Sequence, residues 1–161
     1  MAVVIADAGP LIAFAKIKKL DLLQQLFSEV LLTESVKKEV LTSQSNDALL
    51  IKEAINNGCL KCVADPKLET IVSRSLGGGE KTVIELALQS EESALLIMDD
   101  LLARKTALRH KLNVVGTAML IYGAENKQLI SNADELIDEL RLKKYRISKQ
   151  VIESIKRQLS A

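Results

Sequence analysis

The chain contains 161 residues, of which 48% are hydrophobic, 27% charged and 2% aromatic, and its formal net charge at pH 7 is +1. This composition is typical of one globular domain, and the small net charge means that any nucleic acid would have to be bound by a local basic patch. The scarcity of aromatic residues and the absence of Trp argue against rows of stacking side chains for single-stranded nucleic acid.

Short apolar runs and amphipathic segments alternate through the first half of the chain. Val3–Ala6 is an apolar, largely β-branched run that predicts a buried strand, and residues 29–32 and 60–63 predict a second strand and an edge strand. We expect helices to begin near residues that cap a helix or fit its first turn, namely Pro10, Asp21, Thr33, Ser45 or Asn46, and Pro66. The last of these should run to about residue 76, where three glycines break the chain.

The second half of the chain repeats this alternation. A helix over residues 83–87 leads to a second buried strand at 94–98, and a helix opened by Asp99 and Asp100 leads to a short strand at residues 114–115. Further helices are expected around residues 120–124, from 134 to 142, and after Ser148. The last one carries an apolar stripe that must be buried against the domain or against a second copy: Val151, Ile152, Ile155 and Leu159.

Strands separated by helices predict an α/β fold with a central parallel sheet of about four or five strands and helices on both faces. We find no internal repeat or linker that would divide the chain. Ligands bind such sheets beyond the carboxyl ends of the strands. A functional site is therefore expected at that edge.

The termini and the cysteines indicate the compartment. The N-terminal sequence runs directly into a strand-like segment and does not resemble a signal peptide, and no window approaches the roughly 18 apolar residues of a membrane span. Cys59 and Cys62 provide no disulfide framework. We therefore expect a cytoplasmic protein without a membrane partner.

Acidic residues follow the two clearest strands. Asp7 comes directly after Val3–Ala6, and the Asp99-Asp100 pair comes directly after the strand at 94–98. Asp7 alone has a plain alternative role as a helix cap or turn acceptor, and so does one member of the pair. One aspartate is enough for capping, and two adjacent carboxylates repel each other, so the presence of the second needs another explanation. Hard divalent ions take oxygen ligands, so we expect Asp7 and Asp100 to be metal ligands, with Asp99 as the alternate.

Two glutamates are weaker candidates on local pattern. Glu80 follows Gly77, Gly78 and Gly79, and a glycine run lets the backbone approach a phosphate closely. The order Gly-Glu-Lys-Thr is not that of a nucleotide-binding phosphate loop, because it inserts an acid beside the phosphates. The plain alternative is a first-turn Glu on a solvated helix. Glu39 lies among lysines, and its local pattern indicates only a surface residue.

Other reactive residues favour structural roles. Cys59 and Cys62 have the spacing of half a zinc site, but His110 is the only histidine and no second cysteine pair exists, so we expect two buried thiols near a strand. We expect His110 to be an exposed helix residue. Basic residues near the acids and near the C-terminus either form solvated faces or contact phosphates: Arg104, Lys105, Arg109, Lys111, Lys143, Lys144, Arg146, Lys149, Lys156 and Arg157.

Four segments in this order resemble the PIN domain, and more narrowly its VapC-like branch of toxin ribonucleases. They are IADAGPLIAFAKIKKLDLL, VKKEV, LGGGEKTVIELAL and LLIMDDLLARKTALRHKLNVVGT. The resemblance implies an α/β/α sandwich with a nuclease domain over residues 1–128 and a helical extension over 129–161 packed on it. It also implies a catalytic set of Asp7, Glu39, Glu80 and Asp100 or Asp99, with Asp7, Asp100, Glu80 and Asp99 as candidate ligands of Mg²⁺ or Mn²⁺.

The resemblance further implies an RNA substrate, an antitoxin protein partner and a homodimer. We therefore expect a metal-dependent endoribonuclease, the toxin of a toxin–antitoxin pair, in which the ion activates water for attack on phosphorus. The chain departs from the family in carrying Ala8 and Gly9 where Ser, Thr or Asn often follows the first acid, and we expect Thr117 to supply a hydroxyl instead. The alternative is a catalytically inactive PIN-like module that binds RNA or protein.

Overall fold

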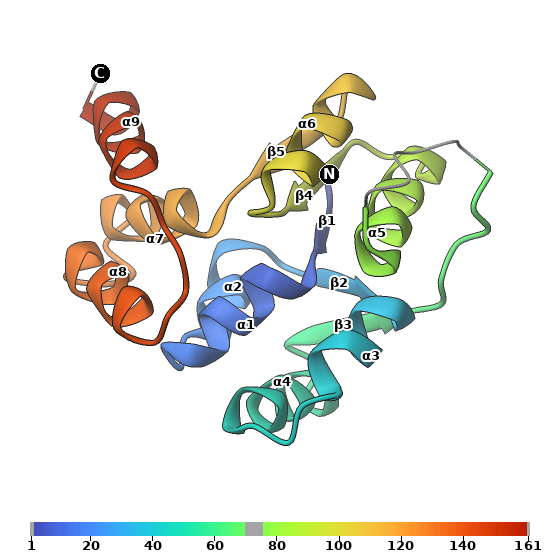
Figure 1. The fold of residues 1–161 in the computed structure, drawn as a ribbon, viewed down its shortest axis with the longest axis horizontal. Coiled ribbons are helices and arrows are strands. Elements are labelled where there is room, and N and C mark those ends of the chain that lie inside the picture. The colour runs from blue at the N-terminus through green and yellow to red at the C-terminus, as the bar shows by residue number, and fades with distance from the viewer. Residues whose placement is uncertain (1, 70–75, 161) are drawn as a thin grey trace.

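The computed structural model describes residues 2–69 and 76–160, which form five strands and nine helices (Figure 1). The strands are β1 Val3–Ala6, β2 Val30–Thr33, β3 Leu60–Val63, β4 Ala94–Ile97 and β5 Asn113–Val115. The helices are α1 Ala8–Lys16, α2 Leu20–Leu26, α3 Glu34–Leu41, α4 Asn46–Asn56, α5 Gly78–Gln89, α6 Leu101–Arg109, α7 Thr117–Asn126, α8 Ala133–Leu142 and α9 Lys149–Ser160.

The strands form one parallel sheet in the order β3-β2-β1-β4-β5. The predicted α/β fold with a parallel sheet of about five strands is confirmed, and β3 lies at an edge as expected. The chain adds strands on one side of β1 first and on the other side afterwards, so the strand order reverses between β1 and β4. Ligands of open parallel sheets bind beyond the carboxyl ends of the strands at such a reversal.

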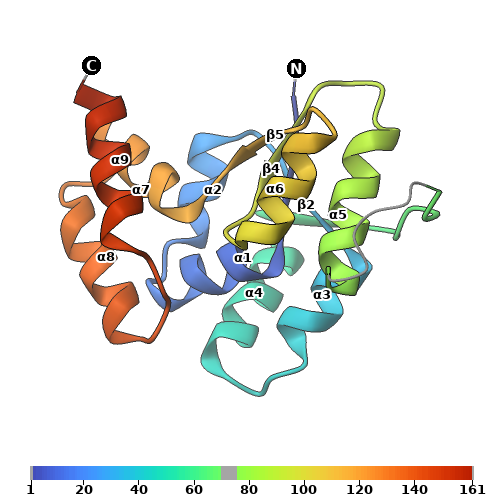
Figure 2. The same cartoon turned by 45° about the horizontal axis from the view of Figure 1, so that its top comes forward.

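Burial explains why the central strands read as continuous apolar runs. Ile5 in β1 and Leu96 and Ile97 in β4 are completely buried, because helices flank the sheet. Helix α5 packs against β1, β2 and β4, and α6 packs against β5. Figures 1 and 2 show α5 at one end of the molecule and α7, α8 and α9 together at the other. The core is built almost entirely from Leu, Ile, Val and Ala, with Phe14 as its largest fully buried side chain.

Helix caps follow the expected chemistry in most places. The Thr33 hydroxyl accepts a hydrogen bond from the Val36 N–H at 3.2 Å, the Ser45 hydroxyl caps α4, and the Ser148 hydroxyl accepts from Val151 at 3.1 Å. The predicted cap at Asp21 is wrong, because α2 begins one residue earlier, at Leu20. Leu20 and Leu23 are three residues apart on one face of the helix, and both are buried. This packing extends α2 toward the N-terminus, so that Asp21 lies inside the helix and not at its cap.

The helix expected from Pro66 is absent over residues 66–69, which have no regular secondary structure; the rest of that prediction, at 70–75, lies outside the described residues. Distant side chains hold this segment instead. Asp65 accepts hydrogen bonds from the Ser35 N–H at 2.9 Å and its hydroxyl at 2.6 Å, and the Lys67 carbonyl accepts one from Gln89 at 2.6 Å. These bonds anchor the segment to α3 and α5 in place of a helix of its own.

The C-terminal helices pack on α7, which contacts both α8 and α9. Ile152 and Ile155 of the predicted apolar stripe are buried and Leu159 is half-buried, whereas Val151 is exposed. The stripe is thus mostly covered by the chain itself. No helix within residues 2–69 and 76–160 is long and apolar enough to cross a membrane.

Candidate functional site

Two aspartates lie where neighbouring central strands end, and each caps the helix that follows. Asp7 follows β1, is only 5% exposed, and accepts a hydrogen bond through Oδ1 from the Ala8 N–H at 2.9 Å. Asp100 follows β4, is exposed, and accepts through Oδ2 from the Ala103 N–H at 3.0 Å. Capping therefore uses one oxygen of each carboxylate and leaves the other without a hydrogen bond among the described residues.

Glu39 and Glu80 meet where α3 packs on α5. A Cβ at buried Gly79 would stand 2.9 Å from Glu39 Oε2 and 3.3 Å from Val36, so only glycine lets the Glu39 carboxylate lie over the first turn of α5. The helix dipole favours a negative charge there. Glu80 accepts through Oε1 from the Gly77 N–H at 2.9 Å. The glycine run thus brings two carboxylates together.

The four carboxylates repel one another. The pKa of Asp7 is raised from 3.8 to about 7, chiefly by burial, and the charges of Glu80, Glu39 and Asp100 raise it further against the effect of the Ala8 hydrogen bond. Burial, with the charges of Asp100 and Glu39, also raises the pKa of Glu80. None of the four forms an ion pair with a Lys, Arg or His within the described residues. Within residues 2–69 and 76–160, no side-chain cation neutralises these carboxylates at ion-pair distance.

The donor set matches a hard divalent cation, because every available atom is a carboxylate oxygen. In residues 2–69 and 76–160, however, no group of three or more His, Cys, Asp or Glu side chains is close enough to hold an ion as it stands. Mutual repulsion opposes a tighter arrangement of four like charges. A cation would have to draw the free oxygens of Asp7, Glu39, Glu80 and Asp100 inward.

Asp99 has different surroundings from Asp100. Its Oδ1 accepts a hydrogen bond from the Thr117 N–H at 2.8 Å, and its Oδ2 accepts from the Thr117 hydroxyl at 2.6 Å and from the Tyr145 hydroxyl. Both oxygens are thus engaged. Gly116 allows this approach, since a Cβ there would lie 2.9 Å from Asp99 Oδ1. Of the adjacent pair, only Asp100 contributes to the raised pKa of Asp7 and of Glu80.

A family model for the PIN domain matches residues 3–161. The chain belongs to the PIN domain family. PIN domains are in general nucleases and generally use divalent metal ions. A comparison with curated proteins found no match.

A groove of about 780 Å³ in this PIN domain is lined in part by Asp99, the neighbour of Asp100 in the chain. Its lining also includes Arg104 of α6, Met119 of α7, Arg146 of the segment between α8 and α9, and Val151 of α9. Arg104 donates a hydrogen bond to the Met98 carbonyl at 2.9 Å, which holds its guanidinium beside the end of β4. Arg146 is exposed and forms no ion pair within the described residues.

The cysteines and the histidine stand apart from the acidic residues. Cys59 is a buried free thiol that donates to the Leu20 carbonyl at 3.5 Å, as expected, but Cys62 is only half-buried because β3 is an edge strand. His110 is the C-terminal cap of α6 and is half-buried, so the expectation of an exposed helix residue is wrong. Its backbone N–H closes the last turn of α6 on the Thr106 and Ala107 carbonyls.

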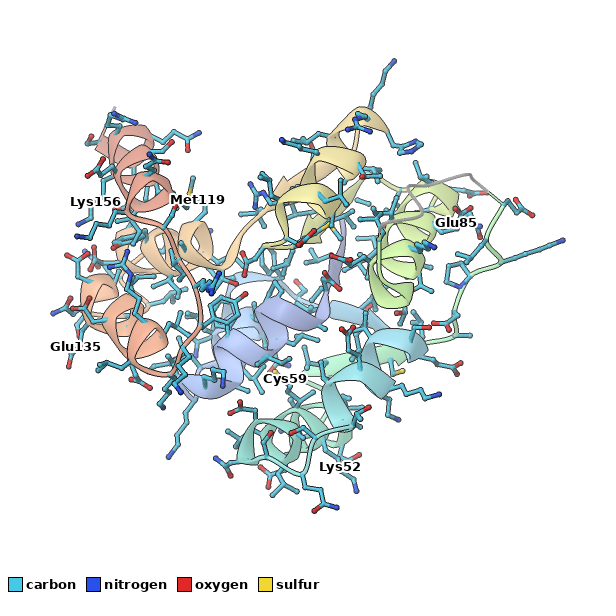
Figure 3. The ribbon with its side chains drawn as sticks, in the orientation of Figure 1. Lys52, Cys59, Glu85, Met119, Glu135 and Lys156 are labelled. Carbon is cyan, nitrogen blue, oxygen red and sulfur yellow. The ribbon has the colours of Figure 1, made fainter. Side chains whose placement is uncertain are left out.

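Sequence reasoning missed two residues. Tyr145 belongs to the segment between α8 and α9, and no local pattern indicates that it reaches Asp99, 46 residues away. Glu85 in α5 is 1% exposed, and its carboxylate accepts hydrogen bonds from the Glu69 N–H at 3.2 Å and from Gln89 at 2.9 Å. Figure 3 shows Glu85 on α5. Its hydrogen bond from the Glu69 N–H holds residues 65–69 against that helix. Its position on the buried face of α5 is the one signal that would have selected it.

Proposed function

We propose that this PIN domain is a divalent-metal-dependent ribonuclease that hydrolyses RNA phosphodiester bonds. One observation carries the proposal: carboxylates from four separate elements repel one another at the carboxyl edge of the sheet. The most buried of them, Asp7, has its pKa raised to about 7 and forms no ion pair with any described residue. A carboxylate placed there costs stability unless a cation compensates it.

The chain's own residues would bind and orient the reactants. Asp7, Glu39, Glu80 and Asp100 would hold Mg²⁺ or Mn²⁺ through the oxygens that capping leaves available. When bound, such an ion supplies Lewis-acid charge that lowers the pKa of water and offsets negative charge developing on the phosphate. The N-termini of α1, α5 and α6 lie at the same edge and present N–H groups that favour a phosphate.

Basic side chains on and near α6, the helix that Asp100 caps, favour a polyanionic substrate. Arg104 lies at the end of β4, and Lys105, Arg109 and Lys111 are exposed on or just after α6. We propose that these residues contact RNA phosphates, which would position the chain without reading sequence. Asp99, whose oxygens are both occupied, would support the site rather than hold the ion.

We further propose that the protein is a VapC-like toxin that works in the cytoplasm, forms a homodimer and is held by an antitoxin protein. The four sequence segments that resemble this branch support the proposal. Apolar side chains at the groove, 66% exposed at Leu101 and 48% at Val151, provide a surface for such a partner. Co-purification of the chain with the product of a short neighbouring reading frame, and size-exclusion chromatography of each alone, would test it.

Cleavage of total RNA by matched variants tests the ribonuclease. Asp7→Asn and Asp100→Asn keep shape and capping ability but remove charge, whereas Asp138→Asn removes an exposed charge on α8 without an ion-pair partner among the described residues. With Mn²⁺, the first two should lose most activity and Asp138→Asn should keep it, and EDTA should abolish cleavage by the parent. Equal cleavage by all three variants would reject the mechanism.

A catalytically inactive PIN-like module is the second candidate, and the absence of a closed metal group among the described residues favours it. Thermal unfolding with millimolar Mn²⁺ separates the two candidates, because a ligand that binds only the folded state raises its stability. A rise in the unfolding midpoint that Asp7→Asn abolishes supports the nuclease. No rise at any Mn²⁺ concentration supports the inactive module.

A further inference from the structure

Tyr145 reaches the acidic edge from a segment far away in the sequence. It lies between α8 and α9, and its hydroxyl donates a hydrogen bond to Asp99 Oδ2, the same oxygen that accepts from the Thr117 hydroxyl at 2.6 Å. Asp99 thus joins three parts of the molecule: the end of β4, the start of α7 and the C-terminal segment. Asp99 is adjacent to Asp100, one of the four carboxylates.

The segment that carries Tyr145 is held at several points. Lys144 takes a left-handed backbone conformation with φ of 65°, which turns the chain so that the Tyr145 N–H donates to the Leu140 carbonyl at 2.9 Å. Lys143 donates to the Lys16 carbonyl at the end of α1 at 2.6 Å, and Arg141 donates to the Ile147 carbonyl. These bonds fix the tyrosine before its hydroxyl meets Asp99.

The start of α1 leaves room for this hydroxyl. A Cβ at Gly9 would lie 3.3 Å from Tyr145 Oη, closer than ordinary van der Waals contact, so glycine lets the tyrosine pack on the turn that follows Asp7. Tyr145 therefore stands between the residues that follow β1 and those that follow β4. A phenol hydroxyl keeps its proton at neutral pH, so Tyr145 can act as the donor to the Asp99 carboxylate.

We propose that Tyr145 is a positioning residue of the metal-binding edge: by holding Asp99 between the turn after Asp7 and the start of α7, its hydroxyl fixes where Asp100 presents its free oxygen. This inference rests on the proposed function. The segment between α8 and α9 then belongs to the site, because the side chain of Tyr145 sets the position of Asp99 and, through it, that of Asp100. Thr117 shares the role through its own two hydrogen bonds to Asp99.

The chain offers a matched control in its only other tyrosine. Tyr122 in α7 also donates to an aspartate, Asp134, at 2.6 Å, and Lys156 pairs with that aspartate at 3.0 Å. Figure 3 shows Lys156 on α9, in the group of helices away from α5. Tyr145→Phe and Tyr122→Phe each remove one hydroxyl-to-carboxylate hydrogen bond and keep the ring, but only the first touches the acidic edge.

The experiment compares Mn²⁺ binding by calorimetry and RNA cleavage kinetics in the full chain. We expect Tyr145→Phe to raise the Mn²⁺ dissociation constant and lower kcat by about tenfold each, as is typical when a partner of a metal-site residue is removed. KM for RNA should stay within about twofold. Tyr122→Phe should leave all three values unchanged, while urea unfolding should show similar losses of stability for both variants.

A double-variant cycle identifies the route of the effect. If Tyr145 acts through Asp99, Tyr145→Phe should change the Mn²⁺ dissociation constant little once Asp99→Ala is present. Equal Mn²⁺ binding and kcat in Tyr145→Phe and Tyr122→Phe would overturn the inference and leave the ribonuclease intact. Failure of the parent protein to bind Mn²⁺ and cleave RNA would overturn the proposed function, and this inference with it.

Discussion

Replacing Asp7 by Asn should stabilise the metal-free protein, and increasingly so as the pH rises. The folded state raises the pKa of Asp7 from 3.8 to about 7, chiefly through burial. Between these two values the folded chain keeps a proton that the unfolded chain has lost, so the contribution of Asp7 to the free energy of unfolding falls as pH rises. At 1.36 kcal/mol per pKa unit, the full difference is about 4 kcal/mol.

Asn caps a helix about as well as Asp and carries no charge to bury, so it should escape this cost. The two pKa values give Asp7 an unfavourable contribution of about 1.7 kcal/mol at pH 5 and about 4.3 kcal/mol at pH 8. The stability gained by Asp7→Asn should therefore grow by about 2.6 kcal/mol between these pH values. The repulsion between Asp7 and Glu80 is already contained in these values, because the charge of Glu80 is one cause of the raised pKa of Asp7.

Urea unfolding in EDTA at pH 5 and pH 8 measures this difference directly, with Asp138→Asn as the control for removing an exposed charge. Comparing variants at each pH cancels titrations that both proteins share. An Asp7→Asn variant that is no more stable than the parent at pH 8, or whose advantage does not change with pH, would refute the account of Asp7 as a buried, repelled carboxylate.

The other predictions concern the cation, the glycine run and the core. Mn²⁺ at 100 times its dissociation constant should raise the free energy of unfolding of the parent by about 2.7 kcal/mol, and thermal unfolding of Asp7→Asn in the same solution should show much less of this gain. Gly79→Ala should cost about 1–3 kcal/mol in urea unfolding, because its Cβ would meet Glu39 and Val36, while Gly78→Ala, with nothing within 4 Å, should not. Leu96→Ala should cost about 2–5 kcal/mol, since Leu96 is completely buried; a loss under 1 kcal/mol would contradict its place in the core.

Sequence patterns predict best those elements whose structure is determined by residues close to them in the sequence. Val3–Ala6 reads as a buried strand because both of its faces are apolar, and Thr33 reads as a cap because its hydroxyl bonds only three residues ahead. The segment after Pro66 fails this condition. The Asp65 side chain accepts from Ser35 of α3, and the Lys67 carbonyl accepts from the Gln89 side chain of α5. A local propensity contains no information about such partners.

The residues of the candidate site also differ in whether local sequence is enough to predict them. Asp7 and Asp100 follow recognisable strands, and their position at the edge of the sheet follows from parallel topology alone. Only the family resemblance indicates Glu39. Its distinguishing feature is that Gly79 of another helix lies close to its carboxylate, and local sequence does not show this. The Thr117 hydroxyl donates to Asp99, but its role in supporting the site stays a prediction. The contact between Tyr145 and Asp99 is visible only in the three-dimensional structure.

The central place of β1 affects the timing of assembly. β1 is made first, yet one of its two neighbours in the sheet, β4, is encoded about ninety residues later, and such non-local pairing is slow because a long loop must close first. A nascent chain that lacks β4 has Asp7, Glu39 and Glu80 but no Asp100 to complete their set. The proposed metal site can therefore be completed only after β4 and Asp100 have been synthesised and have paired with β1.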